Sequence, residues 1–79
     1  MDNLQRLLKL SERLEVWGGG RGVCVSLKNC EIKDGGFLIS TFGTGYTFDE
    51  AVDDYMKIIS GKRLVFNAYS PNRKEVLVL

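Results

Sequence analysis

Apolar residues at the start of the chain recur at the spacing of an amphipathic helix. On a wheel of about 100° per residue they occupy one arc of roughly 160°. They are Leu4, Leu7, Leu8, Leu10 and Leu14. Asp2 or Asn3 can cap the first turn, because short polar side chains accept hydrogen bonds from the free amides there. The pattern predicts a helix that runs to about Val16 or Trp17 and ends at the glycines of positions 18–20.

The next segment alternates between apolar and polar positions with the period of a strand. The alternation separates two sets of side chains: Val23, Val25 and Leu27 on one face, and Cys24, Ser26 and Lys28 on the other. The apolar parity changes near Asn29, because Cys30 and Ile32 share the face of Cys24. This change indicates a bulge, or a strand with both faces partly covered. We therefore predict one extended segment from Val23 to Ile32.

A tight hairpin is predicted at residues 33–36. The sequence Lys-Asp-Gly-Gly holds the Asp-Gly pair that favours a two-residue turn between strands. Phe37 to Phe42 then forms the returning strand.

A second helix is predicted to begin after Thr47. Thr-Phe-Asp-Glu matches a capping box, in which Glu50 reaches back to the cap amide, and Tyr46 is placed to pack on Ala51. Apolar residues then follow at the three-four spacing of one buried face. They are Phe48, Ala51, Val52, Tyr55, Met56 and Ile59. Ser60-Gly61 ends the helix.

Two further strands complete the predicted fold. Residues 62–69 and 74–79 are extended, and Ser70-Pro71-Asn72 forms the turn between them. The 79 residues are therefore expected to form a single two-layer α+β domain over residues 1–79. Its order is α-β-β-α-β-β, with an antiparallel four-stranded sheet.

Composition narrows the function before any motif is considered. The chain has no His, which excludes Ser-His-Asp and Cys-His nucleophile pairs and every zinc site that uses His. No other acid-base pair or metal-ligand set stands out, so we expect a protein that is not an enzyme, with no catalytic residues, no metal and no cofactor. The net charge of +1 means that binding to nucleic acid would depend on a local basic patch.

The two cysteines indicate the compartment. Cys24 and Cys30 lie about 20 Å apart if one strand holds both, whereas a disulfide needs Cα atoms within about 7 Å. We expect two free thiols in a cytoplasmic protein. No stretch is apolar over the roughly 18 residues of a membrane span, and the N-terminus does not resemble a signal peptide. A homodimer stays open, because self-association would bury more apolar surface.

Two glycine-rich segments could contact a ligand. Gly18 to Gly22 follows a predicted helix and opens a strand, the reverse of a phosphate-binding loop, so we interpret it mainly as a connector. Gly43-Thr44-Gly45 lies between a strand and a helix N-terminus. It is the better candidate for binding an anion or for letting a partner approach its backbone closely.

Carboxylates crowd the first turns of the second helix. They are Asp49, Glu50, Asp53 and Asp54. The helix dipole alone favours negative charge there. The functional alternatives are coordination of a cation and an acidic contact surface for a basic partner. The predicted partner-binding residues are Gly43, Thr44, Gly45, Thr47, Asp49, Glu50 and Asp53.

A basic group supports a second hypothesis. Arg6, Lys9 and Arg13 share an arc of about 60° on the first predicted helix, and Arg21 lies nearby in sequence. A solvated helix face explains these residues without a ligand. Contact with a nucleic-acid phosphate backbone is the functional alternative. Trp17, Tyr46 and Tyr69 could add stacking or protein-contact surface, or could cap the core.

The segment from Gly45 to Val52, Gly-Tyr-Thr-Phe-Asp-Glu-Ala-Val, resembles the strand-to-helix junction of the HicB antitoxin N-terminal domain, whose pattern is Gly-x-Thr-x-x-Glu-Ala. The similarity extends over roughly residues 22–66. It is shared with short uncharacterised phage and prophage proteins that also carry Tyr55 and a Ser-Gly-Lys ending. In HicB proteins this domain binds and masks a small toxin nuclease. The resemblance thus implies a small phage-type or mobile-element protein that binds and inhibits or adapts a host protein through a surface around Gly43, Gly45 and Thr47.

Overall fold

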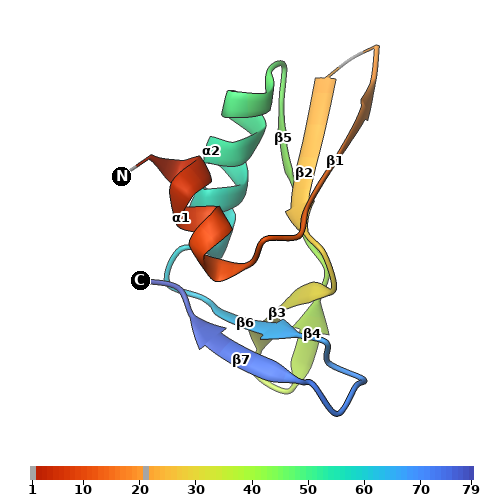
Figure 1. The fold of residues 1–79 in the computed structure, drawn as a ribbon, viewed down its shortest axis with the longest axis vertical. Coiled ribbons are helices and arrows are strands. Elements are labelled where there is room, and N and C mark those ends of the chain that lie inside the picture. Colours follow the sequence, from red (N-terminus) through yellow and green to blue (C-terminus); the bar gives the residue numbers. More distant parts are fainter. Residues whose placement is uncertain (1, 21) are drawn as a thin grey trace.

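The computed structural model describes residues 2–20 and 22–79 and shows an α+β fold, as predicted (Figure 1). In chain order the elements are α1 Asn3–Leu10, β1 Leu14–Gly19, β2 Gly22–Leu27, β3 Cys30–Asp34, β4 Phe37–Ile39, β5 Gly43–Gly45, α2 Phe48–Ile59, β6 Arg63–Phe66 and β7 Lys74–Leu77.

The strands form two antiparallel sheets. The three-stranded sheet has the order β1-β2-β5, and the four-stranded sheet has the order β4-β3-β6-β7. In Figure 1 the three-stranded sheet stands beside α2, and the four-stranded sheet lies below both. The predicted antiparallel four-stranded sheet is thus present, and the additional sheet accounts for the difference in element order.

The first helix is much shorter than predicted. It ends at Leu10, where Ser11 is the C-cap and its N–H donates to the Leu7 carbonyl. The following segment becomes β1 and pairs with β2 from Leu14 to Gly19. Val16 and Trp17 are residue types that favour strands, and pairing with β2 outweighs the leucine spacing that suggested a continuing helix.

The single strand predicted from Val23 to Ile32 is also wrong. β2 ends at Leu27 and β3 begins at Cys30 in the other sheet. The parity change near Asn29 marks a turn between the sheets, and Asn29 itself has φ 52°. Asn tolerates this left-handed conformation better than most residues. Cys24 and Cys30 are both free thiols, but they lie in different sheets and not on one strand.

Several local predictions are confirmed. The Asp2 side chain caps α1, and β3 pairs with β4 across a two-residue turn, with Asp34 opposite Phe37. Thr47 caps α2 by accepting a hydrogen bond from the Glu50 N–H at 3.2 Å. The packing predicted for Tyr46 is wrong, because this side chain is 85% exposed.

The core lies between the two helices and the inner faces of both sheets. The members of this core cluster that are 0% exposed are Leu7, Val25, Ala51, Ile59 and Leu64. The Tyr55 hydroxyl is buried with them and accepts a hydrogen bond from the Leu27 N–H at 3.2 Å. Tyr55 therefore joins α2 to the end of β2, at the point where the chain leaves the three-stranded sheet.

Candidate functional site

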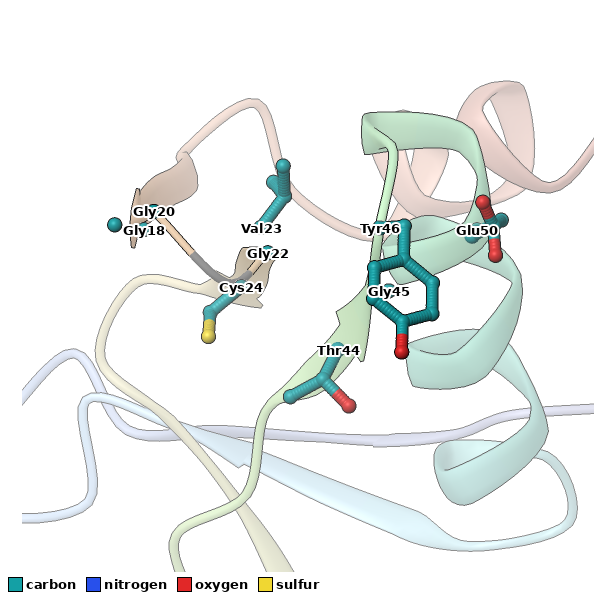
Figure 2. Close-up of a pocket in the computed structure, with 10 residues that line it drawn as sticks. Gly18, Gly20, Gly22, Val23, Cys24, Thr44, Gly45, Tyr46 and Glu50 are labelled. Atoms are coloured by element: carbon teal, nitrogen blue, oxygen red, sulfur yellow. The ribbon is translucent and has the colours of Figure 1, made fainter.

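The two glycine-rich segments come together on the surface. They border a hollow of about 720 Å³ between the tip of the β1–β2 hairpin and the junction of β5 with α2 (Figure 2). The residues around it are Gly18, Gly19, Gly20, Gly22, Val23, Cys24, Thr44, Gly45, Tyr46 and Glu50. Because half of these are glycines, much of the hollow is bounded by bare backbone and can admit a protruding group of a partner.

Gly43 and Gly45 of β5 lie so close to α2 that a side chain would not fit at either position. A Cβ built on Gly43 would lie 2.3 Å from the Ala51 carbonyl oxygen and 2.5 Å from the Tyr55 amide nitrogen. A Cβ on Gly45 would lie 2.6 Å from the Ala51 nitrogen. β5 and α2 therefore approach at backbone contact, and Gly43 is buried beneath the helix. The structure assigns these glycines to packing and leaves Thr44 as the exposed residue of this strand.

The same segment offers no free amides to an anion. Gly43 pairs with Val25 and Gly45 pairs with Val23, so ladder alternation turns the backbones of both glycines toward β2. The Thr44 N–H points the other way and donates to Asp54 Oδ2 at 2.9 Å. The anion-binding interpretation of Gly43-Thr44-Gly45 is therefore wrong.

The outward side of the three-stranded sheet is rich in exposed aromatic surface. We call it the open face and define it by Glu15, Trp17, Cys24, Ser26, Phe42 and Thr44. Trp17 lies opposite Cys24, which lies opposite Thr44. The rings of Trp17 and Phe42 contact at a centroid distance of 5.8 Å, yet their residues remain 45% and 51% exposed. Tyr46 stands at the rim of this face, beside the hollow (Figure 2).

The predicted acidic surface is divided. Asp53 accepts a hydrogen bond from the Asn3 side chain at 2.9 Å, and Asp54 is occupied by the Thr44 N–H. Asp49 is exposed, while Glu50 is exposed at the hollow and accepts the Thr47 hydroxyl at 3.2 Å. Of the predicted partner-binding residues, Thr44, Gly45 and Glu50 are the ones that border the hollow together.

The predicted basic face is not a single surface. Arg6 is half-buried and its guanidinium donates to the Asn3 side chain and to the Leu79 carbonyl, at 3.3 Å and 2.9 Å. Lys9 is exposed in the last turn of α1. Arg13 follows the end of that helix, and Arg21 lies outside the described residues. The helical arc that grouped Arg6, Lys9 and Arg13 does not exist, because α1 ends at Leu10.

The thiols differ in their surroundings. Cys30 is buried, and burial raises its pKa from 9.0 to about 11, which keeps it protonated and unreactive at neutral pH. Cys24 is half-buried and borders the hollow. Among the described residues no three Cys, Asp or Glu side chains gather in a way that could hold a metal ion.

Sequence reasoning named Trp17 and Tyr46 as surface candidates but missed Phe42. Phe42 closes the predicted second strand, and the observed β4 ends before it. Phe42 contacts Trp17 only because residues 14–19 form a strand. A correct prediction of where α1 ends would therefore have indicated this contact.

Comparisons with models of known protein families, with curated proteins and with solved structures give no match to this chain. Neither α1 nor α2, the helices in the described part of the chain, is long and apolar enough to cross a membrane.

Proposed function

We propose that this protein is a small non-enzymatic binding module that contacts another protein through the open face. The observation that carries the proposal is the exposed Trp17–Phe42 pair beside a glycine-bounded hollow, with Tyr46 at the rim. Trp and Tyr are the residue types most enriched where binding energy concentrates in protein interfaces. Bare backbone next to such anchors allows a partner to approach closely.

The charges around this face favour a protein over a nucleic acid. Among the described strand residues that define the open face, Glu15 is the one charged side chain, and Glu50 borders the hollow. A phosphate backbone needs Lys or Arg, and among the described residues these lie at one end of the face, where the Lys28 N–H donates to the Arg13 carbonyl. We therefore expect a partner that offers an apolar side chain to the hollow and a basic group to Glu50.

The resemblance to HicB N-terminal domains supports the same class of function. It implies a domain that masks another protein, with a contact surface at the turn before α2. The proposal does not require the partner to be a toxin, because an inhibitor or an adaptor of a host protein, encoded by a phage or mobile element, would use the same surface. Nucleic-acid binding through Lys9 and Arg13 is the competing function.

Capture from a lysate of the source cells tests the proposal. The bait is the intact chain, compared with Trp17→Ala/Phe42→Ala and with Tyr69→Ala, which removes an aromatic residue that is 91% exposed in the β6–β7 connection of the other sheet. We expect one protein to be retained by the intact chain and by Tyr69→Ala and lost with the double variant.

An electrophoretic assay with RNA and DNA at two salt concentrations covers the competing function. We expect no shift at either concentration. A shift that falls steeply with salt and disappears with Lys9→Glu/Arg13→Glu would contradict the proposal and favour phosphate contact.

A further inference from the structure

One edge of the three-stranded sheet is covered by a helix, and the other edge is not. The β5 edge is covered by α2, and its outward N–H, that of Thr44, is bonded to Asp54. β1 forms the other edge. The Lys28 N–H donates to the Arg13 carbonyl at 2.8 Å. Because hydrogen-bonded and non-hydrogen-bonded pairs alternate along an antiparallel hairpin, this bond shows which residues of β1 face β2 with their backbone groups. The alternation turns the backbone groups of Val16 and Gly18 away from β2.

The outward groups of β1 are available for pairing. The part of the chain that the structure describes supplies no hydrogen-bond partner to the backbone of Val16 or Gly18 on that side. Proteins usually protect such an edge with Lys, Pro or a bulge. β1 has the sequence Leu-Glu-Val-Trp-Gly-Gly, and its six pairs with β2 run without a break.

The apolar side chains of β1 are also incompletely covered. Val16 lies opposite Val25, which is 0% exposed in the core, yet Val16 itself is 52% exposed. The helices therefore do not extend over the edge strand. An added strand would bury Val16 and complete the apolar layer that begins at Val25.

We propose that the occupant of this edge is β1 of a second copy, paired antiparallel about a two-fold axis with Val16 opposite Val16. In this register Leu14 of each copy lies opposite Gly18 of the other. All these residues turn their backbone groups outward, so each pair exchanges both hydrogen bonds. The result is a continuous sheet with the order β5-β2-β1-β1-β2-β5.

Charge and shape select this register. Glu15 of each copy lies opposite Trp17 of the other, whereas a shift that centres the pairing on Glu15 places two carboxylates face to face. Arg13 is diagonal to the Trp17 of the second copy, within the reach of a cation–aromatic contact. The two Trp17 rings are diagonal neighbours as well. The aromatic pairs of both open faces then form one row across the dimer.

Sedimentation equilibrium over a concentration series tests the proposal with three chains. The intact chain should dimerise. Val16→Pro removes an N–H that the isolated fold does not use, so it should fold and weaken dimerisation by about 10- to 100-fold through the loss of two hydrogen bonds. Val16→Thr keeps the N–H and the branched shape and should dimerise like the intact chain. An intact chain that stays monomeric to millimolar concentration, or a dimer unaffected by Val16→Pro, overturns the proposal.

A cross-link provides a second test that does not depend on the folding of the proline variant. Opposed residues of a hydrogen-bonded pair have Cα atoms about 5.5 Å apart, within disulfide range. In a Cys24→Ser background, Val16→Cys should form a disulfide-linked dimer under mild oxidation. Ile39→Cys, at a position of similar exposure in β4, should not. Equal cross-linking at both positions would contradict the proposed register.

Discussion

The outward face of the four-stranded sheet carries ion pairs, whereas that of the three-stranded sheet carries exposed aromatic side chains. On the four-stranded sheet Glu75 binds Lys33 and Arg73, at 3.4 Å and 3.3 Å, and Arg63 lies 4.0 Å away. Val65 is 0% exposed in the same sheet, on the strand opposite Glu75. The open face of the three-stranded sheet instead carries the exposed Trp17–Phe42 pair.

The difference separates a satisfied surface from one suited to binding. Ion pairs over a buried apolar residue leave that face compatible with water. An aromatic pair next to a hollow that is lined largely by glycines leaves apolar area exposed on the surface. This contrast supports the proposal that the open face is the contact surface.

The largest expected effect is on the covered edge of the three-stranded sheet. Gly43→Ala places a methyl group against the backbone of α2, which cannot move away as a flexible side chain can. We expect the free energy of unfolding to fall by about 3 kcal/mol or more, measured by urea denaturation. Gly36→Ala is the control, because nothing lies within 4 Å of its Cβ position. Equal losses in the two variants would contradict the close packing of β5 on α2.

The next largest effect is the loss of partner affinity when Trp17 of the open face is truncated. Trp17→Ala should weaken binding to the captured partner by about 30-fold or more, as expected for an interface anchor. Leu77 is 51% exposed and lies opposite Arg63 on the face that carries the Glu75 ion pairs, which we call the ion-paired face. Leu77→Ala should leave the affinity unchanged. Isothermal titration calorimetry measures both. Matching losses would show that the two faces do not differ in the way proposed.

Tyr55→Phe tests the buried hydrogen bond between α2 and the end of β2. The variant keeps the ring in the core but leaves the buried Leu27 N–H without its acceptor. An unsatisfied buried donor costs about 1–3 kcal/mol, so the midpoint of thermal unfolding should fall. Tyr69→Phe removes an exposed hydroxyl and should have no effect. An unchanged midpoint for Tyr55→Phe would argue against this hydrogen bond.

Alkaline pH should weaken the start of the four-stranded sheet. Burial raises the pKa of Cys30 from 9.0 to about 11, so the folded chain holds this proton after the unfolded chain has released it. The resulting stability is fully present below pH 9.0 and is lost as the pH rises to about 11. Cys30→Val removes the titrating thiol. Its free energy of unfolding should therefore fall less steeply over this interval, and parallel curves would contradict the assignment.

The smallest effect concerns the ion cluster. Although burial acts to raise the pKa of Glu75, the charges of Lys33 and Arg73 hold it below 4.5. The carboxylate therefore contributes stability above its unfolded pKa, and the contribution is lost as the pH falls through the lower folded value. Glu75→Gln should be slightly less stable than the intact chain at neutral pH and low salt. The difference should disappear in acid and shrink in high salt, and a difference that persists in acid would argue against the ion pairs.

Local chemistry made part of the fold predictable. Asp2, Thr47 and the Asp-Gly turn each determine a structure within a few residues, and each is confirmed. The α+β class followed from them. The end of the first helix was not predictable in the same way, because Leu14 fits both a helical stripe and the strand that pairs with Leu27. Only the long-range pairing decides between them.

The candidate site was less predictable for the same reason. Gly43 and Gly45 were recognised as a place of close approach, but the group that approaches them is α2 of the same chain. Asp53 and Asp54 belong to the predicted acidic cluster, but they accept hydrogen bonds from the Asn3 side chain and the Thr44 N–H. Partners supplied by the chain itself appear only when distant segments are placed together.

Photo-cross-linking in the source cells tests the contrast between the two faces most directly. A photoreactive phenylalanine derivative replaces Thr44 on the open face or Leu77 on the ion-paired face, both at exposed positions. We predict a discrete covalent adduct with another protein from position 44 and none from position 77. Adducts of equal yield from both positions, or adducts from position 77 alone, would contradict the assignment of the open face as the contact surface.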